Sequence, residues 1–168
     1  MFKVGPSNLI IESWLFYETS SPNGPKGSIG RRLEVTVIFT SAEPTIAAID
    51  RACALLSGLG GSVSLVDAQI VPYPLGLGEP PVSLDFLKQR LQAITNKSQL
   101  DIAAYVYLCR SPLEMLLSLL APGSIVVIGC WKNWWPSWER KLAKRLVRAG
   151  IHTLLIENGA RRTKNMVP

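Results

Sequence analysis

The hydrophobic pattern of the chain centres on one unbroken apolar run, Ile125-Val126-Val127-Ile128, in which every residue is β-branched. A Pro-Gly turn precedes this run and Gly129 ends it. Such a run is typical of a strand buried on both faces, as in the centre of a parallel sheet. Comparable apolar runs predict further strands over residues 32–39, 62–71, 100–108 and 151–157.

Between the predicted strands, apolar residues recur every three to four positions, which is the period of a helix with one buried face. The predicted stripes are Ile46, Ile49, Cys53 and Leu56; Leu84, Leu87, Leu91 and Ile94; Leu113, Leu116, Leu117 and Leu120; and Trp138, Leu142, Leu146 and Ala149. The third helix has a clear start, because Ser111, Pro112 and Glu114 form a capping box with proline in the first turn. Strands that alternate with helices predict an α/β domain, with a parallel sheet covered on both faces.

The chain is expected to form one domain, since 168 residues suffice to bury a core. Residues 1–31 are predicted to be an N-terminal extension and linker, residues 32–158 the α/β domain, and residues 159–168 a basic C-terminal tail. Within the extension, Ile10 to Phe16 form either a short turn or a strand, docked on the sheet or on a partner. Glu12 interrupts the apolar residues too early for a signal peptide, and no apolar run reaches the roughly 18 residues of a membrane span. We therefore expect a cytoplasmic protein with no transmembrane segment.

Positive charge is concentrated at the end of the chain. The net charge of the whole chain is +6, and residues 130–168 alone contain nine lysines and arginines against two acidic residues. A basic face of this kind attracts nucleic acid, anionic lipid or an acidic protein. A solvated helix face followed by a basic tail is the simpler interpretation.

The sequence offers little for catalysis or metal binding. Cys53, Cys109 and Cys130 lie in apolar surroundings and are expected to be buried, reduced thiols. His152 is the only histidine, so no metal site is expected. No hydrolase or Walker motif is present, and the acidic residues near the predicted strand ends, Glu43, Asp67 and Glu79, are interpreted as solvated loop carboxylates. We therefore expect a protein without enzymatic activity.

Tryptophans follow the central strand at the edge of the sheet where ligands of open α/β folds bind. They are Trp131, Trp134, Trp135 and Trp138. One interpretation is that they fill the volume of a ligand or cover the sheet edge. The other is a stacking platform or a protein-docking patch, because tryptophan is enriched in interface hot spots. A membrane surface and single-stranded nucleic acid are less favoured partners for this cluster.

Several stretches of the chain resemble the universal stress protein family. The stretches are Val37 to Thr40 leading into Ala47 to Ala52, Val66 to Pro72, Arg110 to Glu114, Ile125 to Gly129, and Arg145 to Glu157. The resemblance covers roughly residues 33–157 and rests on the order and length of the elements. It implies an open five-stranded parallel sheet of strand order 3-2-1-4-5, which is a Rossmann-like arrangement.

The resemblance also implies where a nucleotide would bind. ATP-binding members of the family have an aspartate after the first strand and a Gly-x2-Gly-x9-Gly-Ser/Thr motif after the fourth, which lets the backbone approach phosphates. Here Thr40 falls at the aspartate position, Gly129 matches the first glycine, and Lys132 replaces the second. ATP binding in the usual manner is therefore not expected, and no cofactor is predicted. An altered pocket for ATP, AMP or another small ligand stays open as an alternative, with candidate residues Thr40, Ser41, Val71, Gly129, Trp131 and Lys132.

The predicted function is that of a regulatory or protein-interaction domain. By analogy with the family, it forms a homodimer through the edge strand at Thr153, Leu154, Leu155 and Ile156, whose backbone groups are open to pairing. The alternatives are a small-ligand or nucleotide sensor and a basic module for nucleic acid or anionic surfaces. An unidentified protein partner is compatible with the first interpretation, and nucleic acid is the least favoured partner.

Overall fold

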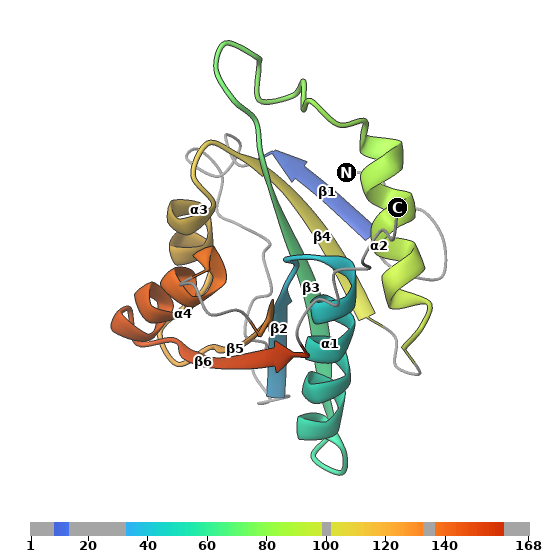
Figure 1. Cartoon of the computed structure of the whole chain (residues 1–168), viewed down its shortest axis with the longest axis vertical. Coiled ribbons are helices and arrows are strands. Elements are labelled where there is room, and N and C mark those ends of the chain that lie inside the picture. The colour runs from blue at the N-terminus through green and yellow to red at the C-terminus, as the bar shows by residue number, and fades with distance from the viewer. Residues whose placement is uncertain (1–8, 14–32, 99–101, 133–136, 160–168) are drawn as a thin grey trace, which may run out of the picture.

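A computed structural model describes residues 9–13, 33–98, 102–132 and 137–159 of the chain (Figure 1). Strands and helices alternate in the order β1 (Leu9–Ser13), β2 (Leu33–Ile38), α1 (Ala42–Leu56), β3 (Gly61–Ile70), α2 (Leu84–Thr95), β4 (Ile102–Cys109), α3 (Pro112–Leu119), β5 (Ile125–Trp131), α4 (Trp138–Arg148) and β6 (His152–Asn158). No helix in these ranges is both long and apolar enough to cross a membrane.

The strands form one parallel sheet in the order β1-β4-β3-β2-β5-β6. The five strands expected from the sequence take the predicted order 3-2-1-4-5, so that part of the topology is confirmed. Strand β1 adds a sixth strand to this sheet, from within the expected N-terminal extension. It pairs with β4 from Leu9 beside Ala104 to Ser13 beside Leu108. Its hydrogen bonds satisfy backbone groups that β4 would otherwise leave open at the sheet edge.

Two hydrophobic cores lie on opposite faces of the sheet. Alternate residues of each strand point to opposite faces, so Val35 and Val37 of β2 belong to the core beneath α1 and α2. Ile38 belongs instead to the core beneath α3 and α4. Helix α3 begins as the sequence predicts, since the Ser111 hydroxyl accepts a hydrogen bond from the Glu114 amide.

The predicted apolar stripes are only partly correct. Helix α1 turns small residues to the sheet, with Ala48 and Ala52 fully buried, which leaves Ile46 and Cys53 half-buried. Leu117 of α3 and Trp138 of α4 are exposed, the latter by 51%. The helical period was right, but the width and centre of each buried stripe depend on how the helix rolls on the sheet. Of the predicted buried thiols, Cys109 and Cys130 are buried, and burial raises the pKa of Cys109 to about 11.

Candidate functional site

Strand β2 ends before its neighbours at the carboxyl edge of the sheet, and this set-back strand end is called the notch. Its last residue, Ile38, pairs with Val66 of β3 and Ile128 of β5. Strand β3 continues to Ile70 beside β4, and β5 continues to Trp131 beside β6. The chain leaves β2 here and enters α1. The notch also marks the change in strand order, where ligands of open α/β sheets bind.

Thr40 and Gly129 meet at this notch. The Thr40 hydroxyl donates a hydrogen bond to the Gly129 carbonyl at 2.7 Å, which links the exit of β2 to β5. The Thr40 amide donates to the Thr45 hydroxyl at 3.1 Å, which links the same residue to the first turn of α1. Thr40 therefore fixes the start of α1 against the central strands.

Gly129 has a packing reason to be glycine. A Cβ atom placed on it would lie 1.9 Å from the carbonyl oxygen of Pro44, far inside any allowed contact. The missing side chain lets the first turn of α1 rest directly on β5. The backbone of Gly129 is thus approached by the helix, in the place where the family resemblance suggested a phosphate.

The remaining predicted ligand residues do not all share this place. Ser41 is the N-cap residue of α1, and its carbonyl accepts the Thr45 amide at 3.0 Å. Trp131 ends β5, and the amide of the exposed Lys132 donates to the Asn158 carbonyl of β6 at 2.8 Å. Val71 lies apart, fully buried, with its amide bonded to the Cys109 carbonyl of β4 at 2.9 Å. Two members of the tryptophan cluster, Trp134 and Trp135, lie outside the described residues.

An ion pair next to the notch was missed by the sequence analysis. Asp67 of β3 is only 1% exposed, and its carboxylate accepts hydrogen bonds from Arg90 of α2 at 2.6 Å and from Gln69 at 2.7 Å. The guanidinium of Arg90 lies over the ring of Phe39, 4.3 Å from its centroid. The interpretation of Asp67 as a solvated loop carboxylate is therefore wrong. The signal was present, because Val63, Leu65 and Asp67 occupy alternate positions of one strand and must share a face.

Burial dominates the electrostatics of this pair. Desolvation of the carboxylate raises the pKa of Asp67, while the hydrogen bond from Gln69 and the charge of Arg90 act in the opposite direction. The cluster therefore connects α2 to β3 of the sheet.

Arg110, which directly follows β4, organises the loop after β3. Its guanidinium donates hydrogen bonds to the carbonyls of Val71 and Leu75, the latter at 2.7 Å. The same group lies 4.0 Å from the centroid of the Tyr73 ring. Two backbone carbonyls and one ring are thus held by a single side chain, although this loop is rich in proline and glycine.

The predicted interface residues Thr153 to Ile156 lie in β6, the edge strand at the other side of the sheet. The amide of His152 donates to Ser124, and the carbonyl of Asn158 accepts from Lys132. In a parallel pair, alternate residues bond to the neighbouring strand, so the even-numbered residues of β6 face β5. The backbone groups of Thr153, Leu155 and Glu157 therefore point away from the sheet, and no described residue pairs with them.

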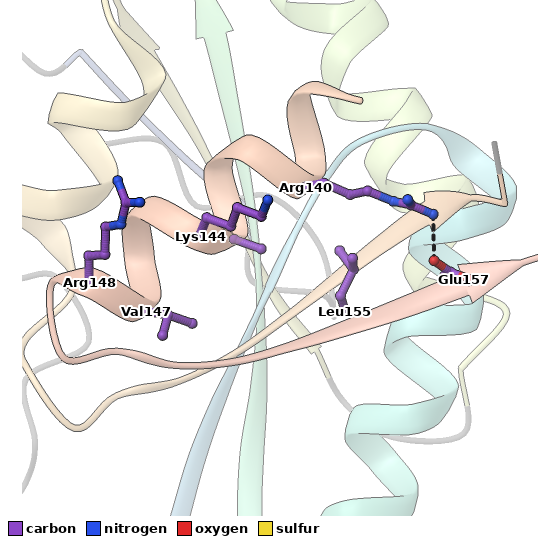
Figure 2. Close-up of a pocket in the computed structure, with 7 residues that line it drawn as sticks. Arg140, Lys144, Val147, Arg148, Leu155 and Glu157 are labelled. Atoms are coloured by element: carbon purple, nitrogen blue, oxygen red, sulfur yellow. Dashed lines mark hydrogen bonds and ion pairs between the residues drawn. The ribbon is translucent and has the colours of Figure 1, made fainter. Parts of the chain in front are cut away.

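A groove of about 500 Å³ lies between α4 and β6 (Figure 2). Figure 2 shows Arg140, Lys144 and Arg148 along α4, with Val147 and Leu155 between the helix and the strand. Arg140 forms an ion pair of 2.5 Å with Glu157 at one end of the groove. Lys144 and Arg148 have no carboxylate within ion-pair distance among the described residues.

Comparisons with known proteins support the fold class. No family model matches the chain, and no curated protein matches it. Among solved structures, the chain resembles a universal stress protein family member from Burkholderia pseudomallei, with a TM-score of 0.50 and 16% identity over 73% of this chain and 94% of that one. It also resembles a universal stress protein in complex with cAMP, with a TM-score of 0.47 and 14% identity over 74% of this chain and 95% of that one. The chain therefore has a universal-stress-protein-like fold.

Proposed function

We propose that the protein is a non-enzymatic interaction module that recruits another polypeptide strand through the open edge of β6. The observation that carries this proposal is the set of outward backbone groups at Thr153, Leu155 and Glu157, left unpaired by every described residue. Edge strands of this kind are templates for strand addition, in which main-chain hydrogen bonds supply affinity and side-chain pockets supply specificity.

Apolar side chains near β6 support the same proposal. Val147 is 55% exposed beside the strand, and Leu154 is 36% exposed on the opposite face of the sheet. Burying both against a partner removes apolar surface from water, at roughly 25 cal/mol per Å². Natural sheets protect an edge with charge, proline or a bulge, whereas the outward positions of β6 are a threonine, a leucine and one glutamate that is already paired.

The absence of enzymatic activity is part of the proposal. At the carboxyl edge, Thr40 is bonded to Gly129 and Thr45, and Asp67 is bonded to Arg90 and Gln69. These groups hold the helices to the sheet. A catalytic acid or base needs a site within hydrogen-bond reach of a substrate proton, and these side chains direct their polar atoms at one another.

A small-ligand sensor is the second candidate, favoured by the notch where β2 ends between two longer strands. Thermal unfolding with and without Mg-ATP, AMP and cyclic nucleotides tests it. A ligand at about 100 times its dissociation constant stabilises the fold by roughly 2.7 kcal/mol, which raises Tm by about 2–4 °C. A shift that Trp131→Ala abolishes would support the sensor, and the absence of any shift would reject it for these ligands.

Substitution of Thr153 tests the interaction module. Thr153→Pro removes one outward amide without breaking a bond to β5, since proline is tolerated on edge strands whose N–H faces solvent. Thr153→Val keeps that amide and serves as the matched control.

Sedimentation velocity over a range of concentrations tests pairing with a second copy, which the sequence analysis predicted. Affinity capture from an extract of the source cells tests other proteins. We expect an association that Thr153→Val retains and Thr153→Pro loses. If no association occurs, or if it survives the proline, the proposal is wrong.

A further inference from the structure

We propose that the strand received by β6 is an extended segment of a partner protein in which acidic and apolar residues alternate. Its acidic side chains lie along the cations of α4, and its apolar side chains lie on the opposite face of the sheet. This inference rests on the proposed function and names the chemistry of the partner.

The cations of α4 form a stripe alongside the open edge. Arg140, Lys144 and Arg148 are spaced i, i+4 and i+8, so they share one side of the helix. Helix α4 runs back along β6, with Arg140 beside Glu157 at one end of the groove and Arg148 at the other (Figure 2). Three cations and one carboxylate thus line the groove, and Lys144 and Arg148 are exposed with no carboxylate in ion-pair distance among the described residues.

The spacing of this stripe suits an extended chain. Four residues of an α-helix rise about 6.0 Å, and two residues of a β-strand rise about 6.6–6.8 Å. The spacing of alternate side chains on an added strand would therefore match the spacing of successive cations over the length of the groove. Val147 and Leu155 line the groove between the cations of α4 and β6. They would contact the aliphatic stems of the added strand's acidic side chains.

The other face of β6 has different chemistry. Leu154 pairs beside Val127 of the α1-side core, so its side chain lies on that face. It lines an apolar hollow of about 940 Å³ together with Leu33, Leu55, Leu59 and Ile125. Because successive residues of a strand point to opposite faces, a strand added to β6 would present every second side chain to cations and the others toward this hollow.

Two other occupants fit the groove less well. A second copy that pairs antiparallel through β6 has its α4 on the same face of the joined sheet. The stripes Arg140, Lys144 and Arg148 of both copies would then lie side by side, and like charges repel. A nucleic acid would match the cations, but it would use neither the outward amides of Thr153 and Leu155 nor the apolar hollow.

Fluorescence anisotropy with a labelled peptide of alternating glutamate and valine tests the inference. We expect saturable binding to the full chain, and no binding of the same peptide with lysine in place of glutamate. Lys144→Glu with Arg148→Glu should weaken binding by about tenfold or more, which corresponds to about 1.4 kcal/mol. Lys141→Glu with Arg145→Glu is the matched control, with the same change in charge and spacing on exposed positions of α4 outside the groove, and it should retain most of the affinity.

The proline variant separates the outcomes. Peptide binding that both Thr153→Pro and the groove variant weaken supports the inference. If the peptide does not bind but the protein self-associates through an edge that Thr153→Pro blocks, the inference is wrong and the proposed function stands. If a labelled oligodeoxythymidine binds in place of the peptide, and Thr153→Pro leaves that binding intact, both are wrong.

Discussion

At the scale of single residues, Gly129 shows that a glycine which matches a ligand-binding motif can instead be required by packing. The sequence analysis assigned it to a candidate ligand site because it ends the central strand. The structure shows the Pro44 carbonyl in the space that a side chain would need. A glycine at the end of a strand can thus serve the approach of a helix as readily as that of a ligand.

Replacing Gly129 with alanine should destabilise the protein, because the new methyl group forces the first turn of α1 away from β5. Overpacking of this kind typically costs about 1–3 kcal/mol. The measurement is urea unfolding at equilibrium, with Gly78→Ala as the control, since nothing lies within 4 Å of a Cβ at Gly78. Equal stability of the two variants would contradict the packing role of Gly129.

The raised pKa of Asp67 predicts how the free energy of unfolding changes with pH. Burial raises the folded-state pKa of Asp67 above its ordinary value, so the folded protein binds the proton more tightly than the unfolded chain does. Stability conferred by protonation is therefore gained as the pH falls from neutral through the raised pKa, and it is absent above that range. The free energy of unfolding of the wild type, relative to Asp67→Asn, should increase from pH 7 to about pH 4.5. A decrease would mean that the charge of Arg90 outweighs burial.

At the scale of elements, the loop after β3 depends on one side chain from the turn between β4 and α3. Arg110 binds two loop carbonyls and covers the ring of Tyr73. Hydrogen bonds from charged groups contribute about 1.5–3 kcal/mol, although Tyr73 itself is 81% exposed. The loop can therefore keep one conformation without regular secondary structure.

Arg110→Ala should loosen this loop more than it weakens the whole fold. Hydrogen exchange is expected to speed up at Val71 and Leu75 while the amides of β2 stay protected. Limited proteolysis should cut the variant first within residues 72–82. The exposed Arg51 of α1 provides the control substitution Arg51→Ala. Exchange that rises uniformly across the sheet would show that Arg110 stabilises the fold as a whole.

The sequence predicts the strands and helices better than it predicts the contacts between them. Alternating apolar runs predict the strands and helices, and the family resemblance supplies the strand order. Thr40 and Gly129 meet because Ile38 at the end of β2 pairs with Ile128 of β5. Val71 departs from that group because β3 runs beyond the end of β2, and the register of these two strands is not defined by the apolar pattern. The pairing of Asp67 with Arg90 joins residues in different elements, which local periodicity cannot reveal. The short strand β1 has too few residues to distinguish it from a turn.

At the scale of the whole molecule, the sheet is asymmetric. It ends on one side in β1, a strand of five residues that pairs with β4, and on the other side in β6, a strand of seven residues whose outer edge no described residue covers. The faces beside β6 also differ, with cations on the α4 side and apolar side chains on the α1 side. The proposed recognition of a strand with alternating acidic and apolar residues uses this difference between the two sides of β6.

Hydrogen exchange along β6 is the measurement that tests this account most directly. The outward amides of Thr153, Leu155 and Glu157 are compared with the inward amides of Leu154 and Ile156, which serve as an internal control. The account predicts that the outward amides exchange fast in the isolated protein and become protected when the alternating acidic–apolar peptide is added, while the inward amides stay protected throughout. Outward amides that remain unprotected with the peptide, and also at high protein concentration, would contradict a role for β6 in receiving a strand.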